Sequence, residues 1–101
     1  MSFQINAKSD EVFVTLAKEV YVEQASNFRE ALMPYLNSGH KNFILDVSSL
    51  SYIDSSGLGV LIGIQKKAIS NGGKVVIKGL NGQVKELFEL TRLTKIFEIV
   101  D

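Results

Sequence analysis

The segment FILDVSSLSYIDSSGLGVLIG, residues 43–63, joins a nearly continuous apolar run to an aspartate, two serines and three glycines. An apolar run such as that of residues 42–48 predicts a central strand, covered on at least one face of its sheet. Over residues 56–70 the apolar positions recur at helical spacing instead. The segment therefore predicts a strand that turns directly into a helix.

The sequence before this segment predicts a hairpin and a helix. Residues 3–6 and 11–17 alternate in polarity like strands, and the turn between them contains Lys8, Ser9 and Asp10. Residues 23–38 predict an amphipathic helix that stops at a Gly39 cap. Its apolar positions recur every three or four residues, at Ala25, Phe28, Leu32 and Leu36. Pro34 removes a backbone donor inside this helix and predicts a kink or an early end.

After the segment, Asn71-Gly72-Gly73 signals a turn, followed by a predicted strand at 74–78, a helix at 82–93 and a strand at 95–100. Strand-helix-strand crossovers in one sheet are nearly always right-handed, so the helices should share one face of the sheet. We expect an α/β fold with a mixed, mainly parallel sheet of four to five strands and helices packed on one face. At 101 residues the chain is expected to form a single domain, residues 1–101.

Composition narrows the class of protein. Eleven basic and eleven acidic residues give zero formal net charge, which favours neither nucleic acid nor an anionic membrane as a partner. The sequence has no cysteine, so disulfides and thiolate metal sites are excluded. Its longest apolar and glycine run, residues 57–64, falls far short of the ~18 residues of a spanning helix. We expect an untargeted cytoplasmic protein.

Ser55 and Ser56 raise the question of nucleophilic catalysis. A serine nucleophile needs a base within hydrogen-bond reach, and the sequence has one histidine, His40, at the far end of the first predicted helix. Lys66 and Lys67 lie about three helical turns beyond Ser55. The sequence does not favour a serine hydrolase.

The glycines raise the question of a nucleotide site. Gly57, Gly59 and Gly63 have the spacing G-x-G-x-x-x-G, one residue longer than the dinucleotide fingerprint. The acid expected about 20 residues further on is missing, since residues 66–85 contain neither Asp nor Glu. A small nucleotide-binding domain stays an alternative.

The start of the predicted helix at 56–70 allows a structural and a functional interpretation. Asp54, Ser55 or Ser56 stands where a helix N-cap is needed. Leu58, Leu61, Ile62 and Ile69 predict its core face, with Val60 and Ile64 at the flank, and a further stripe contains Ser56, Val60, Gly63 and Lys67. Glycines destabilise a helix by ~1 kcal/mol each, so they need a reason, which is either close packing of the backbone or a flat surface for another protein. Spacing alone leaves both open.

The motif DSSGLG, residues 54–59, entered from FILDVSSLSYI and followed by VLIG, resembles the signature of bacterial anti-sigma-factor antagonists of the STAS family. The resemblance continues through NGGKVVIKGLNGQVKELFELTRLTKIFEIV and so covers most of the chain. It implies a STAS-like domain that takes part in transcription regulation by partner switching. The domain itself would be neither an enzyme nor the holder of a cofactor.

The resemblance also implies partners and a modification site. The partner would be an anti-sigma factor with a histidine-kinase-like ATPase fold, which acts as a serine kinase, and a serine phosphatase would reverse its action. The phosphate acceptor of the family falls on Ser55. We expect partner contacts along the motif and the helix behind it, at Tyr21, Asp54, Ser55, Ser56, Gly57, Leu58, Gly59, Val60, Gly63 and Lys67.

The sequence departs from the family pattern at two places. The family often has Gly-x-Leu-Asp after its second strand, where this chain has Lys18-Glu19-Val20-Tyr21, so Tyr21 replaces an acid. The usual Thr-Gly-Leu near the last helix reads Thr91-Arg92-Leu93. A STAS module that serves as a scaffold or sensor and is never phosphorylated is therefore a second hypothesis.

Overall fold

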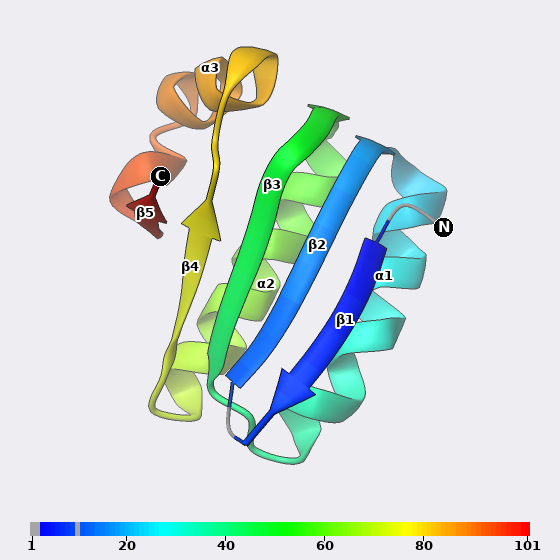
Figure 1. The fold of residues 1–101 in the computed structure, drawn as a ribbon, viewed down its shortest axis with the longest axis vertical. Helices are drawn as coiled ribbons and strands as arrows, with labels where there is room; N and C mark the ends of the chain where they lie inside the picture. Colours follow the sequence, from blue (N-terminus) through cyan, green and yellow to red (C-terminus); the bar gives the residue numbers. More distant parts are fainter. Residues whose placement is uncertain (1–2, 10) are drawn as a thin grey trace.

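The protein is described here by a computed structural model that covers residues 3–9 and 11–101. Within those ranges five strands form one sheet in the order β1-β2-β3-β4-β5, which is also their order along the chain (Figure 1). The elements are β1 (Phe3–Lys8), β2 (Glu11–Val20), α1 (Val22–Asn37), β3 (Asn42–Ile53), α2 (Ser55–Ser70), β4 (Lys74–Lys78), α3 (Gly82–Leu90), a 3₁₀ turn (Leu93–Lys95) and β5 (Glu98–Val100).

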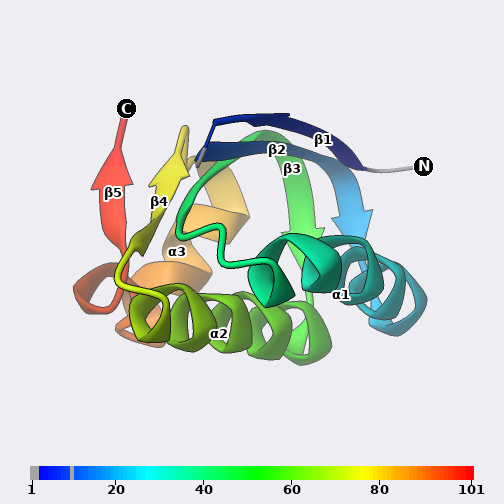
Figure 2. The same ribbon diagram turned by 90° about the horizontal axis from the view of Figure 1, so that it is seen from below.

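The sheet is mixed and mainly parallel, as predicted. The hairpin strand β1 pairs antiparallel with β2, whereas β2, β3, β4 and β5 pair in parallel. The helices α1 and α2 lie side by side against the same face of the sheet (Figure 2). The predicted α/β fold with helices on one face is therefore confirmed. Of the predicted first turn, Asp10 lies outside the described residues.

Strand β3 is longer than its apolar run predicted, because it continues to Ile53 rather than ending near residue 48. Burial alternates strictly up to Val47 and then falls on Leu50 and Ile53, three residues apart each time. The register with β2 shifts twice over this part, and the Ser51 hydroxyl donates to the Lys18 carbonyl at 2.8 Å. These irregularities extend the strand without the alternating polarity that identifies one in a sequence.

Helix α1 does not end at Pro34, so the predicted early end is wrong. Pro34 is exposed, on the solvent face, where water can replace the backbone hydrogen bond that proline removes. The predicted Gly39 cap is confirmed: its φ is +93°, and its amide donates to the Leu36 carbonyl at 3.2 Å. The next amide, of His40, donates to the Tyr35 carbonyl at 3.0 Å, which completes a Schellman motif.

The core lies between the sheet and the helices. All four predicted apolar positions of α1 are buried. In α2 the predicted core positions Leu58 and Leu61 are buried and Ile62 is half-buried. The prediction is wrong at two positions, because the expected flank residue Ile64 is buried and the expected core residue Ile69 is 57% exposed. The buried row continues from Leu61 through Ile64 to Ala68, and Ile69 is rotated away from it by one residue step of about 100°.

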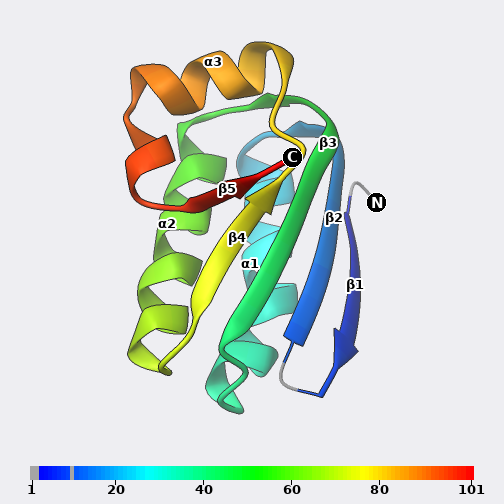
Figure 3. The same cartoon turned by 60° about the vertical axis from the view of Figure 1, so that its left-hand side comes forward.

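The C-terminal elements are shorter than predicted. Helix α3 ends at Leu90 because Arg92 adopts a left-handed backbone with φ of +60°, and the 3₁₀ turn follows. Phe97 is buried, and β5 contains only Glu98–Val100. Helix α3 crosses the end of the sheet at which β3 and β4 terminate (Figure 3). No helix in the described residues is long and apolar enough to span a lipid bilayer.

Candidate functional site

The candidate site lies at the carboxyl edge of the sheet, where β2 and β3 each turn into a helix. Tyr21 follows β2 as the N-cap residue of α1, and Asp54 follows β3 as the N-cap residue of α2. The Asp54 amide donates to the Val20 carbonyl at 3.1 Å, so the two strand ends are bonded to each other. This bond brings the start of α2 next to the start of α1.

Asp54 is the cap of α2, which decides between the three N-cap candidates of the sequence. Its carboxylate oxygen Oδ1 accepts a hydrogen bond from the Gly57 amide at 3.0 Å. Ser55 is then the first residue of the helix, and its side chain is exposed, while Ser56 and Asp54 are half-buried. The phosphate acceptor implied by the resemblance is therefore accessible from solvent.

Gly57 and Leu58, two of the expected partner-contact residues, are buried in the free protein. A Cβ atom at Gly57 would lie 2.5 Å from Cγ1 of Ile53 and 2.9 Å from Cγ1 of Val20. Glycine at this position lets the first turn of α2 pack directly on the ends of β2 and β3. The close-packing interpretation therefore applies to Gly57, which supports the surface from beneath.

Gly59 and Gly63 lie in the opposite environment. Both are exposed, and a Cβ atom at either position would meet no atom within 4 Å apart from its chain neighbours and the backbone of its own helix. Because nothing in the described fold packs on them, close packing does not explain their presence. With Ser55 they occupy positions i, i+4 and i+8 of α2 and form an exposed row in which the two glycines leave the helix backbone bare. We call Ser55, Gly59 and Gly63 the glycine row.

The other residues of the predicted stripe lie beside the glycine row. Val60 is half-buried on its flank, and Lys67 is exposed in the last turn of α2. Lys67 lies 12 residues after Ser55, which is about 18 Å along a helix at 1.5 Å per residue. The expected partner-contact residues of α2 thus divide into exposed positions along its length and buried positions in its first turn.

Two tyrosines form an exposed aromatic pair beside the helix starts. The ring centroids of Tyr21 and Tyr52 lie 5.2 Å apart with an interplanar angle of 36°. Tyr21 is 45% exposed and Tyr52 is 40% exposed. Tyr52 was not among the residues predicted from the sequence. Its only signal there is its place directly before the buried Ile53 in a strand end, where neighbouring side chains point to opposite faces.

The environment of Tyr21 keeps its phenol protonated. Partial desolvation, followed by the nearby Glu19 carboxylate, raises the pKa of Tyr21 above its ordinary value of 10.0. The Tyr21 hydroxyl donates to Oε2 of Glu19 at 3.3 Å, and the Tyr21 amide donates to Oε1 of Gln24 at 3.0 Å. The residue that replaces the family aspartate is thus a neutral aromatic donor.

The catalytic and nucleotide alternatives lack support from this geometry. His40 and Ser55 lie beyond opposite ends of β3, and the His40 ring is occupied with Tyr35 and Ser38 at the end of α1. At the start of α2 the Asp54 carboxylate already binds the Gly57 amide, where it would repel a nucleotide phosphate. Among the described residues, no cluster of three or more His, Asp or Glu side chains could hold a metal ion.

Comparison with known proteins assigns the family. The sequence model of the STAS domain matches residues 2–101. The chain belongs to the STAS domain family. It is 32% identical to the anti-sigma-B factor antagonist of Bacillus subtilis over 101 residues, which cover 98% of this chain and 92% of that protein. This STAS-domain chain thus aligns with that relative over most of both lengths.

Solved structures agree with the family assignment. The crystal structure of a Thermotoga maritima protein, provisionally named an anti-sigma factor antagonist, superposes with a TM-score of 0.90 at 32% identity and covers 98% of this chain and 86% of that chain. The Bacillus protein SpoIIAA in its phosphorylated form superposes with a TM-score of 0.80 at 19% identity, over 98% of this chain and 91% of that chain. At 19% identity this second similarity shows a shared fold and nothing more.

Proposed function

We propose that this STAS-domain protein is an anti-sigma-factor antagonist controlled by reversible phosphorylation of Ser55. Its unmodified form binds an anti-sigma factor of the histidine-kinase-like ATPase fold and frees a sigma factor. The bound kinase transfers the γ-phosphoryl group of ATP to the Ser55 oxygen, the hydroxyl proton is lost, and ADP leaves. A serine phosphatase hydrolyses the phosphoserine and restores binding. The domain itself performs no catalysis and acts in the cytoplasm.

The observation that carries this proposal is the position of Ser55. It is the exposed first residue of α2, directly after a cap that is already made by Asp54. A kinase can reach the Ser55 hydroxyl without unfolding the helix, because no capping hydrogen bond depends on that side chain. The similarity to the Bacillus subtilis antagonist over nearly the whole chain supports the same assignment.

The local electrostatics allow a phosphate without loss of the fold. A phosphate at Ser55 adds a charge of about −1.5 to −2, which the N-terminus of a helix stabilises by roughly 0.3 to 1 kcal/mol. The Asp54 carboxylate opposes it by about 1 to 2 kcal/mol in water-like surroundings, and screening by salt reduces this repulsion toward the size of the helix effect. The two effects nearly cancel in the free protein.

In a complex the same charge has a larger effect. Burying an ion without a partner is unfavourable by several kcal/mol, and each ~1.4 kcal/mol changes the affinity tenfold. The partner is proposed to cover the glycine row together with Tyr21, Asp54, Ser56, Val60 and Lys67. Because Ser55 lies within this surface, between the helix caps and Gly59, its phosphate would be buried against the partner and would dissociate the complex.

The proposal is tested by incubating the protein with ATP, Mg²⁺ and the anti-sigma factor kinase of its host, followed by mass measurement. One added phosphate on the peptide that contains Ser55 is the expected result. Ser55→Ala removes the acceptor and serves as the negative control, whereas Ser56→Ala leaves it in place and should still be modified. Stable binding without any phosphorylation would instead indicate the scaffold function, which the replacement of the family aspartate by Tyr21 makes a specific second candidate.

A further inference from the structure

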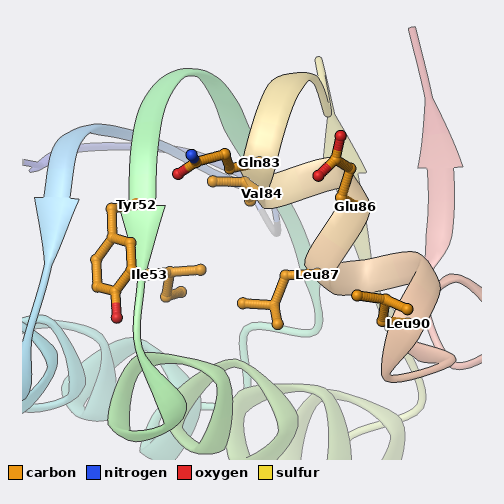
Figure 4. Close-up of a pocket in the computed structure, with 7 residues that line it drawn as sticks. All are labelled: Tyr52, Ile53, Gln83, Val84, Glu86, Leu87 and Leu90. Atoms are coloured by element: carbon orange, nitrogen blue, oxygen red, sulfur yellow. The ribbon is translucent and has the colours of Figure 1, made fainter.

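A hollow of about 200 Å³ lies between the end of β3 and α3, beside the candidate site (Figure 4). Ile53 and Val84 are buried in it, and Leu87 is half-buried on the α3 side. An apolar cavity of about 150 Å³ is large enough to hold benzene. The hollow is therefore large enough for one aromatic or branched aliphatic side chain.

The rim of the hollow exposes apolar surface. Leu90 is 82% exposed on the last turn of α3, and Tyr52 is 40% exposed on the other side. Figure 4 shows both residues at the two sides of the hollow, with Leu87 between them. Single exposed leucines are common on proteins, but here the exposed residues surround a recess that they do not fill.

The charged residues that line the hollow have one sign, although the exposed Lys85 directly precedes Glu86 in α3. Glu86 lines it, and a second, shallower hollow of about 400 Å³ on the same helix is lined by Glu86, Glu89 and Leu90. In the described part of the chain, neither hollow is lined by a lysine or an arginine. An occupant with basic side chains next to its apolar residue would complement this rim.

The hollow is continuous with the surface around Ser55. Tyr52 lines the hollow and packs against Tyr21 at the start of α1. Ile53, on its floor, directly precedes Asp54 and Ser55. A protein that covers Ser55 therefore reaches the hollow through the two tyrosines, and tyrosine is one of the residue types that dominate binding energy at protein interfaces.

We propose that this hollow receives an apolar side chain from a basic segment of the same protein that docks at Ser55. The inference rests on the proposed function for the identity of that protein, and on the lining residues for the chemistry of the segment. Leu87 and Leu90 contact the inserted side chain, Tyr52 bounds it, and Glu86 and Glu89 pair with the flanking lysines or arginines. Helix α3 thereby contributes to the choice of partner.

The chemistry of the hollow can be tested without the partner. Two helical peptides of equal length, one of leucine and lysine and one of leucine and glutamate, are titrated into the isotope-labelled protein while amide resonances are followed by NMR. The lysine peptide should shift the resonances of Tyr52 and of residues 86–90, and the glutamate peptide should not. The double substitution Glu86→Lys and Glu89→Lys should reverse this preference. Equal shifts with both peptides, or shifts spread over the whole surface, would contradict the proposal.

A second experiment links the hollow to the partner. Leu90→Ser should weaken binding to the anti-sigma factor at least tenfold, whereas the control Ile96→Ser, at a residue that is 49% exposed and lines neither hollow, should change it less than twofold. If the wild-type protein does not bind the anti-sigma factor, the proposed function fails, and the peptide titration still decides the chemistry of the hollow. If Ser55 is phosphorylated normally and Leu90→Ser binds like wild type, the role of the hollow is wrong while the proposed function stands.

Discussion

The Asp54 carboxylate accepts a hydrogen bond from the Gly57 amide at 3.0 Å, across the first turn of α2. Because of this hydrogen bond, one residue caps the helix and its neighbour remains free to be modified. Asp54 satisfies the helix terminus, and Ser55 is left exposed with its hydroxyl available for modification. Charge can be added to Ser55 while the capping bond is kept, which is the physical basis of the proposed switch.

Substitutions at Ser55 should separate binding from modification. Ser55→Asp places a permanent negative charge in the proposed interface and should weaken binding of the anti-sigma factor by at least ~2 kcal/mol, about 30-fold in Kd. Ser55→Ala should bind and resist phosphorylation. Calorimetric titration of both variants measures the effect, and wild-type affinity in both would remove the mechanism. Both variants should unfold within ~0.5 kcal/mol of the wild type.

The three glycines of α2 should respond differently to alanine. Gly59→Ala and Gly63→Ala each place a methyl group in open space, so each should stabilise the protein by up to ~1 kcal/mol through helix propensity. Gly57→Ala forces a methyl group against Ile53 and Val20 and should destabilise it by about 1 to 3 kcal/mol. Urea unfolding gives the three values.

Gly59→Ala and Gly63→Ala also test whether the glycine row contacts the partner. If the glycine row contacts the anti-sigma factor, Gly59→Ala and Gly63→Ala should bind it more weakly although they are more stable. Unchanged affinity in both would exclude the glycine row from the interface. Ser70→Ala, on the exposed last turn of α2, controls for a general effect of alanine in this helix.

Two positions with left-handed backbone should accept glycine. Lys18 has φ of +63° and Arg92 has φ of +60°, a conformation that is unfavourable by roughly 1 kcal/mol or more for residues with a Cβ atom. These positions match the glycines of the Gly-x-Leu-Asp and Thr-Gly-Leu patterns that the STAS family often has. Lys18→Gly and Arg92→Gly should therefore be at least as stable as the wild type in urea unfolding. Lys66→Gly, in the middle of α2, is the matched control and should lose ~1 kcal/mol.

Gln65 connects α2 to both β4 and Ile96, the residue directly after the 3₁₀ turn. Its Nε2 donates to the Ile96 carbonyl at 2.6 Å, and its Oε1 accepts from the Val75 amide at 3.0 Å. The Gln65 side chain is buried. Gln65→Met removes its donor and its acceptor and leaves the Ile96 carbonyl and the Val75 amide without these hydrogen bonds, so it should destabilise the fold by about 2 to 4 kcal/mol. Gln4→Met, at an exposed position of β1, should stay within ~0.5 kcal/mol. If Gln65→Met also changed the free energy of unfolding by less than ~0.5 kcal/mol, the bridging role of Gln65 would be wrong.

Acid should weaken the fold through Asp46. The hydroxyl and the amide of Ser48 both donate to Asp46 Oδ1, at 2.7 Å and 2.9 Å, and lower the pKa of Asp46 below its ordinary value of 3.8. Because the folded-state pKa is the lower one, the stabilisation is present above the ordinary value and is lost as the pH falls through the folded-state pKa. Ser48→Ala should reduce this acid-dependent loss, measured by urea unfolding at a series of pH values. The neighbouring Ser49→Ala should leave it as in the wild type.

Several features of this protein could be predicted from residues alone because they depend on local periodicity. The apolar positions of α1 recur with the helical period and are all buried, and Gly39 ends that helix in the left-handed conformation its residue type favours. The central apolar strand and the order of the elements predicted a mainly parallel sheet with helices on one face, because crossover connections are nearly always right-handed. The role expected of Ser55 came instead from the resemblance of the DSSGLG motif to the STAS family, and the sequence left open which of Asp54, Ser55 and Ser56 caps the helix.

Only the tertiary structure decided which of these residues face solvent and which face each other. Gly57 and Gly59 are two positions apart in one helix, yet the first packs on Ile53 and the second on nothing within the described fold. The Tyr21–Tyr52 pair and the hollow beside α3 join residues far apart in the sequence, and two register shifts in the sheet set where β3 ends. Such contacts depend on how strands and helices pack in three dimensions, which residue spacing along one element does not encode.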